Sequence, residues 1–213
     1  MAKGMTLKEA LKNSENVRIR MFKSDFLEKF SYVHPLTPFI IFVPVVSVSL
    51  YFAATHFQNS WQNILMYFGI GLLAWSLLEY FLHRFIFHPP QTNEFFRKVY
   101  FYIHGIHHDA QDDASRLVMP PGVSIPLAVG IYFGFQALFG ELFLPAFAGL
   151  VTGYMIYDYF HFASHFYAFK NPWFKMIKKN HMRHHNVAPN KNFGFTSPIW
   201  DIVFGSYYRV KAK

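Results

Sequence analysis

The chain of 213 residues contains no cysteine, which excludes disulfides, thiolate metal ligands and a catalytic cysteine. Charged residues make up only 15% of it, and the first 30 residues lack the apolar core of a cleavable signal peptide. A Walker motif, the glycine fingerprint of dinucleotide-binding folds and the surroundings of a serine nucleophile are also missing. Nucleotide-dependent and serine-hydrolase chemistries are therefore disfavoured.

Long apolar stretches dominate what is present, with 53% apolar and 21% aromatic residues. Four of them approach the roughly 20 residues that a helix needs to cross hydrocarbon. They cover about residues 36–56, 61–82, 121–140 and 145–162. The links FQNS and ELFL are so short that neighbouring stretches pair as hairpins, and Pro44 and Pro126 predict kinks. The sequence predicts an all-α integral membrane protein with four transmembrane helices in two hairpins.

Positive charge is confined to one side of these predicted helices. The 20 Lys and Arg residues divide into seven before residue 36, four within 83–120 and nine from 161 onward. By the positive-inside rule, both termini and every histidine cluster face the cytoplasm, in a bacterial inner membrane or the endoplasmic reticulum. Residues 1–35 are then a cytoplasmic amphipathic segment, and 36–213 form the membrane domain. Orientation accounts for the net charge of +8, so no nucleic-acid partner is predicted.

Ten of the twelve histidines fall into four clusters at or near the ends of apolar stretches. Spacings of three and four place imidazoles on one helical face, and neutral imidazole is a common transition-metal ligand. Ten ligands exceed the needs of one ion, so the sequence predicts a site for two metal ions. Histidines scattered for solubility or pH sensing would not repeat HxxHH. The predicted ligands are His83, His88, His104, His107, His108, His161, His165, His181, His184 and His185.

Two segments outside the apolar stretches are predicted to be interfacial helices that hold this site. In residues 92–109 and 171–186, an apolar stripe continues into a histidine stripe on the same helical face. The apolar part would lie at the membrane boundary, and the histidine part would face a shared metal core. These helices form the predicted cytoplasmic cap.

The first histidine cluster requires a distorted helix. Positions five apart on an ideal helix point about 140° away from each other. His83 and His88 can therefore share a site only if the helix end is distorted or unwinds, just before Pro89 and Pro90 terminate it.

Two carboxylates lie one turn before histidines on predicted helices. Asp158 precedes His161 by three residues and is expected to accept a hydrogen bond from a ligand imidazole, or else to cap or pair with a nearby cation. Glu79 precedes His83 by four residues, and it either plays the same part or is neutralised by Arg84.

Four segments resemble the membrane fatty acid hydroxylase and sterol desaturase superfamily, whose HxxxH-type and HxxHH boxes bind a dimetal centre. They read EYFLHRFIFH, HGIHHDAQDDASRLVMPP, GYMIYDYFHFASH and HMRHHNVAPNKNFGFTSPIWD. The histidine boxes identify the superfamily, whereas DDASRLVMPP and GFTSPIWD are similar to the fatty acid 2-hydroxylase branch. The resemblance runs from about residue 36 to residue 208, so 36–213 is expected to be a hydroxylase domain.

The resemblance implies 2-hydroxylation of a fatty acyl chain, either free or as the N-acyl group of a sphingolipid such as ceramide. Among all-histidine sites, iron suits the activation of dioxygen, whereas zinc that took its place in a purified sample would be redox-silent. Relatives often carry an N-terminal cytochrome b5 domain, but residues 1–35 here are basic and amphipathic. Electrons are therefore expected from a separate protein such as a cytochrome b5 or a ferredoxin-type protein.

Four further residues are candidates for the reaction or for substrate binding. The segment 112–124 joins the second histidine box to the third apolar stretch and is expected to line or gate a lipid entrance. Within it, Asp113 and Arg116 hold the loop or contact a lipid head group, and a structural ion pair is an equally good interpretation. Tyr157 and Asp158 are the candidate catalytic residues, although helix packing explains Tyr157 equally well.

Two other functions remain open at the level of sequence. A sterol or carotenoid hydroxylase or desaturase of the same superfamily would share the histidine boxes and differ in its product. The other is a membrane metal-binding or transport protein. A transport path would need histidines at mid-span, whereas the clusters all lie on one side of the membrane.

Replacing His104, His108, His161 or His184 with Ala is expected to abolish activity and to lower the amount of bound metal, because each change removes a predicted ligand. Product formation and metal content per protein, both measured on membrane-inserted variants, test this expectation. Activity retained in all four variants would refute the ligand assignment.

His34 and His56 provide the matched controls for these variants. They are the two histidines outside the clusters, and their replacement with Ala is expected to leave activity and metal content unchanged.

Overall fold

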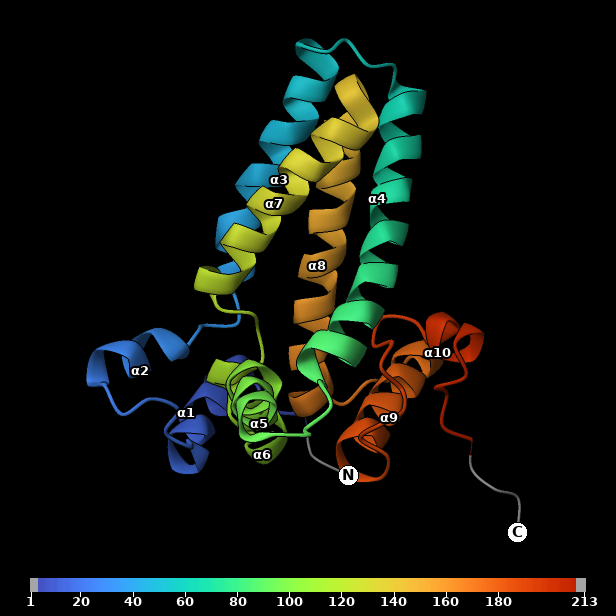
Figure 1. Ribbon diagram of the computed structural model, residues 1–213. Coiled ribbons are helices and arrows are strands. Elements are labelled where there is room, and N and C mark those ends of the chain that lie inside the picture. The colour runs from blue at the N-terminus through green and yellow to red at the C-terminus, as the bar shows by residue number, and fades with distance from the viewer. Residues whose placement is uncertain (1–3, 210–213) are drawn as a thin grey trace.

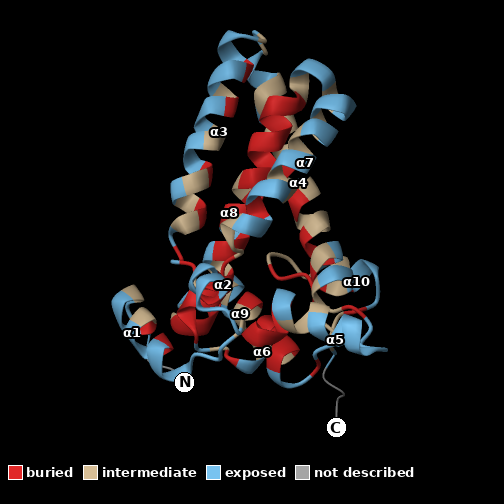
Figure 2. Cartoon of the chain, turned by 60° about the vertical axis from the view of Figure 1, so that its left-hand side comes forward, coloured by how far each residue is buried: buried red, intermediate tan, exposed pale blue. Residues whose placement is uncertain are grey.

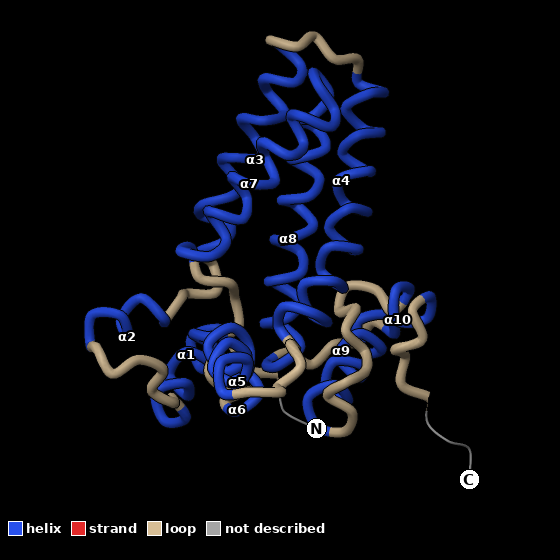
Figure 3. The backbone as a smooth tube through the Cα atoms, viewed as in Figure 1, coloured by secondary structure: helices blue, strands red, loops and turns tan. Residues whose placement is uncertain are grey.

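The computed structural model describes residues 4–209, and every regular element within them is helical (Figure 3). Four long helices stand side by side at one end of the molecule, and the shorter helices gather at the other end (Figure 1). The long helices are α3 (Thr37–Thr55), α4 (Trp61–Phe81), α7 (Pro121–Phe139) and α8 (Phe143–Phe166). The shorter ones are α1 (Leu7–Val17), α2 (Asp25–Ser31), α5 (Glu94–Tyr100), α6 (Ile106–Asp109), α9 (Pro172–Asn186) and α10 (Ile199–Val203). The all-α prediction is confirmed.

Three helical stretches are long and apolar enough to cross a membrane, namely Thr37–Thr55, Trp61–Phe87 and Ala114–Phe166. The third contains both α7 and α8, which are joined by the 3-10 turn η4 (Gly140–Leu142). Each of the four predicted apolar stretches therefore coincides with a long helix, and Pro44 and Pro126 lie inside α3 and α7. The length and apolar composition of these helices identify an integral membrane protein.

Helix α8 forms the centre of the bundle (Figure 2). It is buried along most of its length, whereas α3, α4 and α7 expose large apolar side chains such as Ile40, Leu73 and Phe133. On the inner side, the rings of Phe42 from α3 and Trp75 from α4 both pack against Tyr154 of α8. The bundle therefore has an apolar core and an apolar outer surface, as helices surrounded by lipid require.

Helices α4 and α8 approach each other closely at two glycines. A Cβ atom on Gly71 would lie 2.0 Å from the carbonyl oxygen of Ala146, and one on Gly149 would lie 2.0 Å from that of Phe68. Both clashes are with backbone atoms, so a side chain at either position would push the helices apart. The contact matters for function because both helices lead into histidine-bearing segments.

The N-terminal segment packs at the end of the molecule where the shorter helices gather, which is called the cap end. Helix α1 begins with a capping box, in which the Thr6 hydroxyl accepts a hydrogen bond from the Glu9 backbone N–H. The Ser14 hydroxyl of α1 accepts a hydrogen bond from the Ala114 N–H at 2.7 Å. Helix α2 lies near the lower ends of α3 and α7 (Figure 1). The segment thus covers the loop between α6 and α7.

The Gly71→Ala variant is expected to be less stable than the wild type, because its new methyl group would meet the α8 backbone. Overpacking of this kind typically costs about 1–3 kcal/mol, which lowers the melting temperature by roughly 2–4 °C per kcal/mol for a chain of this size. Thermal unfolding in detergent measures the difference. Gly69→Ala is the matched control on the same helix, since a Cβ atom there meets nothing within 4 Å. Equal melting temperatures for the two variants would contradict the close helix contact.

Candidate metal centre

All ten clustered histidines lie at the cap end of the bundle, on four separate parts of the chain. His83 and His88 lie in and just after the π-helix η1 (Leu82–Phe87) that continues α4, and His104 lies in a second π-helix, η2 (Phe101–Gly105). The following helix α6 carries His107 and His108. Helix α8 contributes His161 and His165, and α9 contributes His181, His184 and His185. The fold therefore brings all four clusters together.

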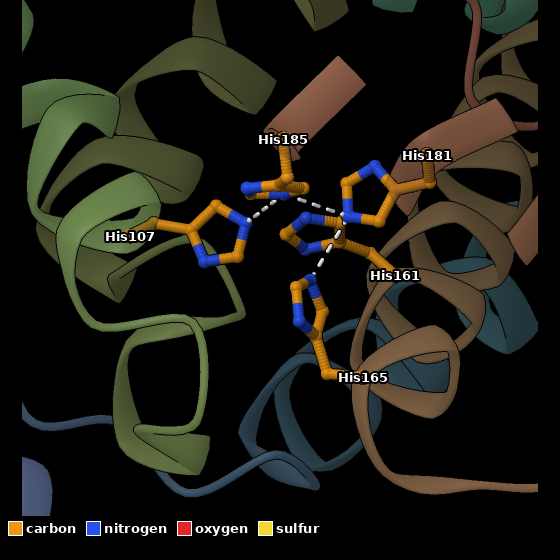
Figure 4. A group of neighbouring side chains, drawn as sticks. All are labelled: His107, His161, His165, His181 and His185. Carbon is orange, nitrogen blue, oxygen red and sulfur yellow. Dashed lines mark hydrogen bonds between the residues drawn. The ribbon is translucent and has the colours of Figure 1, made fainter. Parts of the chain in front are cut away.

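One group of imidazoles comprises His107, His161, His165, His181 and His185 (Figure 4). Each offers one nitrogen, and these nitrogens all lie within 4.8 Å of one another. The Nε2 atom of His181 is 2.9 Å from that of His165 and 3.0 Å from that of His185. Three helices thus direct ring nitrogens toward one small volume.

A second group comprises His83, His88, His104 and His184, whose nitrogens also lie within 4.8 Å of one another. The Nε2 atoms of His83 and His104 are 3.2 Å apart, and those of His184 and His88 are 3.0 Å apart. His108 belongs to neither group. Its ring centroid lies 4.2 Å from that of His185 and 4.9 Å from that of His88, so it stands between the two groups.

The chemistry of these groups fits a metal ion. Burial, first of all, and the neighbouring histidines lower the pKa of His88 to about 3 and that of His108 to about 2. Burial likewise lowers the pKa of His184 to about 4. These imidazoles are therefore neutral at pH 7 and carry a free lone pair. Several lone pairs that face one another across 3 Å are best satisfied by a cation between them.

The helix distortion predicted for the first cluster is present. At the end of η1 the backbone N–H of His88 donates to the carbonyl of His83 at 3.2 Å, a bond that spans five residues. Their ring centroids are consequently only 5.1 Å apart. Short π-helical turns are rare and are frequently found at functional sites, which is consistent with their position here.

Backbone carbonyls orient three of the imidazoles. The Nδ1 atoms of His83, His161 and His184 lie 2.6 Å, 2.8 Å and 2.8 Å from the carbonyl oxygens of Phe193, Leu117 and Lys191, respectively. An Nδ1–H that donates to a carbonyl leaves the Nε2 lone pair free to face the centre of the group. This set of hydrogen bonds selects the tautomer that a metal requires.

The two carboxylates expected to contact imidazoles have other partners. Asp158 accepts a hydrogen bond from the Met119 N–H at 3.4 Å, and His161 turns to Leu117 instead, so the expected carboxylate–imidazole bond is wrong. Glu79 accepts from the N–H groups of Phe195 and Thr196 at 2.6 Å and 2.9 Å. Both expectations for Glu79 are therefore wrong. Its carboxylate binds the backbone of a segment around residue 195, which lies far away in the sequence.

The segment 191–206, a loop that includes the short helix α10, is a part of the site that sequence reasoning missed. Asp201 accepts from the N–H groups of Phe193 and Gly194 at 2.9 Å and 2.7 Å, which fixes the backbone that orients His83. The Phe195 ring packs 4.9 Å from the ring of His181. The sequence signal for it is GFTSPIWD, a segment that resembles the fatty acid 2-hydroxylase branch and ends in Asp201.

A cavity of about 340 Å³ opens beside both histidine groups. Its wall contains His104 of one group and His107 and His161 of the other, and most of its remaining lining is apolar. Tyr157 and Asp158 also line it, and the Tyr157 ring stacks on His161 with centroids 5.6 Å apart. The loop 112–124 contributes residues 116–120 and Val123, so it lines the cavity as expected.

Asp113 and Arg116 form an ion pair next to this cavity. The Arg116 Nε atom is 3.3 Å from Asp113 Oδ2, and Arg116 also contacts Glu28 of α2. Asp113 is fully buried, and its carboxylate accepts from the N–H and hydroxyl of Ser115, which fixes the short helix η3 (Ala114–Arg116). Of these two residues, Arg116 is among those that line the cavity, whereas Asp113 is not.

Comparison with known proteins places this arrangement among lipid hydroxylases. The profile of the family described as fatty acid hydroxylase matches residues 68–206. Dihydroceramide fatty acyl 2-hydroxylase FAH2 of Arabidopsis thaliana is 35% identical over 194 residues, covering 91% of this chain and 81% of that protein. Fatty acid 2-hydroxylase of Rattus norvegicus is 34% identical and covers 87% of this chain, which spans 56% of the rat protein. A solved structure described as full-length scs7p, with only the hydroxylase domain visible, matches with a TM-score of 0.81 and 27% identity over 98% of this chain and 91% of that chain.

Asp201→Asn is expected to weaken metal retention while the helical fold persists, because one of the two oxygens that hold the loop 191–206 becomes a donor. Loss of such supporting contacts typically lowers metal affinity by roughly 10–100-fold. Metal content after dialysis against graded concentrations of chelator measures the change, and circular dichroism checks the fold. Glu141→Gln, in an exposed turn, is the control. Identical retention curves for the two variants would show that the loop does not support the site.

Proposed function

The chain belongs to the fatty acid hydroxylase family, and we propose that it 2-hydroxylates fatty acyl chains, either free or as the N-acyl group of sphingolipids such as ceramides. It is an oxidoreductase of membrane lipids. The observation that carries the proposal is the cavity, because one apolar space is bordered by histidines of both groups. An acyl chain in that space would lie against the metal centre and away from bulk water.

We propose that the ten clustered histidines hold two metal ions, one in each group. His108, which lies between the groups, is the tenth proposed ligand. The convergent, neutral imidazoles support this assignment. When bound, a pair of iron ions supplies the redox chemistry that oxidation of an unactivated C–H bond by dioxygen requires, whereas zinc would be redox-silent. The protein itself orients the imidazoles through the carbonyls of residues 117, 191 and 193 and encloses the acyl chain.

We propose Tyr157 and Asp158 as the residues of this chain that act nearest to the reacting carbon. Both line the cavity on the same turn of α8, immediately before the ligand candidate His161. The Tyr157 ring limits how the acyl chain lies against His161. The Asp158 carboxyl is buried beside the acyl path, where it can exchange a proton with a polar group of the substrate.

The reaction needs two electrons, because R–H, dioxygen and two protons yield R–OH and water only when two electrons are supplied. We propose that they come from a separate redox protein such as a cytochrome b5 or a ferredoxin-type protein. These 213 residues contain no cysteine and so no thiolate to hold an iron–sulfur cluster, and a donor of the ferredoxin type would therefore be another protein.

We propose four membrane spans, with residues 1–35 and both termini in the cytoplasm and 36–213 as the hydroxylase domain. Helices α7 and α8 run in opposite directions (Figure 1), and Gly140 at their junction has a φ of +54° that suits a reversal. The confinement of Lys and Arg to the histidine-bearing side supports a cytoplasmic metal centre in a bacterial inner membrane or the endoplasmic reticulum.

Expression in a sphingolipid-producing host under ¹⁸O₂ is expected to yield 2-hydroxy acyl lipids that carry one heavy oxygen atom. Mass spectrometry of the extracted lipids detects them, and His104→Ala provides the inactive control. Hydroxylated sterols or carotenoids with unchanged acyl chains would transfer the proposal to another branch of the superfamily. If no lipid changed while vesicles containing the protein took up zinc or iron, the chain would be a transporter.

A further inference from the structure

Helix α2 presents an apolar face that the described residues 4–209 leave uncovered. Phe26, Leu27 and Phe30 expose 70%, 50% and 64% of their surface, respectively. Their spacing places them on one side of the helix. The rings of Phe26 and Phe30 pack edge to face, with centroids 5.0 Å apart. Exposed apolar groups that gather in this way mark a surface where a protein meets a partner or a membrane.

The opposite side of α2 keeps this face turned outward. Glu28 and Ser31 on that side are buried. The Glu28 carboxylate accepts hydrogen bonds from Arg116 at 2.8 Å and from the Phe22 N–H at 2.7 Å. Turning α2 so that its phenyl rings became buried would withdraw this carboxylate from its partners, and separating a buried ion pair is strongly unfavourable. The outward position of the apolar face is therefore built into the fold.

Basic side chains border the apolar face. The segment 18–31 contains two acidic residues, of which Glu28 is buried and Asp25 pairs with Arg20. Its four basic residues are all exposed, namely Arg18, Arg20, Lys23 and Lys29. The exposed charge of the segment is therefore positive. An apolar helix face flanked by Lys and Arg is typical of a helix that lies on a membrane containing anionic lipids.

The apolar face of α2 is continuous with the outer surface of the membrane helices. Residues 32–36 join α2 directly to α3, whose Ile40 side chain is exposed beyond the exposed Leu36. The short helix α10 likewise exposes Ile202 and Val203. In two views, α2 and α10 both lie beside the cap end of the long helices (Figures 1 and 2). A layer of hydrocarbon that surrounds the long helices would reach both short helices at that height.

The same segment borders the cavity beside the metal centre. Met21, which precedes α2, and Ser31, its last residue, both line this cavity. The Phe22 ring stacks on the lining residue Tyr102, with centroids 5.3 Å apart. The wall reaches the molecular surface at four exposed apolar residues, which form the opening of the cavity: Ile86, Tyr102, Ile103 and Val123.

We propose that α2 is a membrane anchor, with Phe26, Leu27 and Phe30 inserted into the lipid leaflet on the side of the metal centre. The basic residues of the segment 18–31 face the anionic head groups of that leaflet. The anchor holds the opening of the cavity against the leaflet, so a hydrocarbon chain enters without crossing water, where its apolar surface would be unfavourably exposed. The identity of the lipid that enters rests on the proposed function, whereas the membrane contact of α2 does not.

Spin labels on single cysteines test the anchor, because the chain has no cysteine of its own. The full-length Phe26→Cys and Phe30→Cys proteins are labelled in vesicles of phosphatidylcholine and phosphatidylglycerol. Collisions of each label with oxygen, which concentrates in lipid, and with a water-soluble nickel chelate are then measured. The oxygen-to-nickel collision ratio is expected to equal that of a label at Ile40, on the outer surface of α3, within about a factor of two.

Asp25→Cys is the matched control on the same helix. Position 25 lies roughly 150° around α2 from the centre of the apolar face. Its side chain is 92% exposed, and its pairing with Arg20 at the surface contributes little stability. A label there is expected to have a collision ratio several-fold lower than labels at positions 26 and 30. Labels at Ile103 and Val123 report on the opening of the cavity and are expected to have the higher, lipid-like ratio.

Equal ratios at positions 25, 26 and 30 would overturn the anchor, and so would spin–spin broadening at position 30, which would place a second copy of the chain on this face. A water-like ratio at both positions 103 and 123 would overturn the contact of the opening with the leaflet. Bound metal per protein confirms that each labelled variant is folded. The collision ratios do not depend on lipid oxidation, so the anchor and the proposed 2-hydroxylation stand or fall separately.

Discussion

The structure depends on the convergence of nine imidazoles on two adjacent small volumes, with a tenth, that of His108, between them. Each group draws on three distant parts of the chain, so no single helix can supply it. Imidazoles in such a place must be desolvated, correctly oriented and uncharged, and the fold satisfies each requirement separately. Burial lowers their pKa values, and backbone carbonyls fix the tautomer of three of them. The helices, the π-helical turns and the C-terminal loop are all arranged to meet these conditions.

The membrane helices and the metal centre are structurally continuous. Helices α4 and α8 touch through Gly71 and Gly149 and then continue directly into η1 and into the turn that carries His161 and His165. At the end of the bundle, the carboxylates of Glu79 and Asp201 accept hydrogen bonds from backbone N–H groups of the segment whose carbonyls orient His83 and His184. A carboxylate that holds two successive N–H groups fixes both the position and the direction of a loop, which a packing contact alone does less well. The apolar part of the protein therefore defines the geometry of the polar part.

The cavity combines the two environments that a lipid needs. Most of its wall is apolar. Its lining also includes Arg116 and Asp158, and histidines of both groups border it. Met21 and Ser31 of the N-terminal segment also line the cavity, although they lie more than 50 residues before the first histidine box. The charge around Arg116 then depends on a contact between α2 and the loop after α6, two parts of the chain that are 88 residues apart.

Local periodicity was sufficient to identify the apolar helices, the histidine clusters and the need for a distorted helix between His83 and His88, because each of these is a relation between residues a few positions apart. The division of the histidines between two groups followed no such rule: His104 joins His83, whereas His107 joins His161. The Asp113–Arg116 ion pair was one of the interpretations that the sequence allowed, whereas the partners of Glu79 and Asp158 and the contact of Arg116 with Glu28 were out of its reach. A carboxylate one helical turn from a histidine has the right spacing to contact it, but tertiary packing brought stronger backbone donors from distant loops to Glu79 and Asp158 and turned the imidazoles toward carbonyls. The sequence by itself determined which residues are available for metal and lipid chemistry, and only the tertiary structure decided which of them meet, because burial rewards whichever donor and acceptor the packed chain brings into contact.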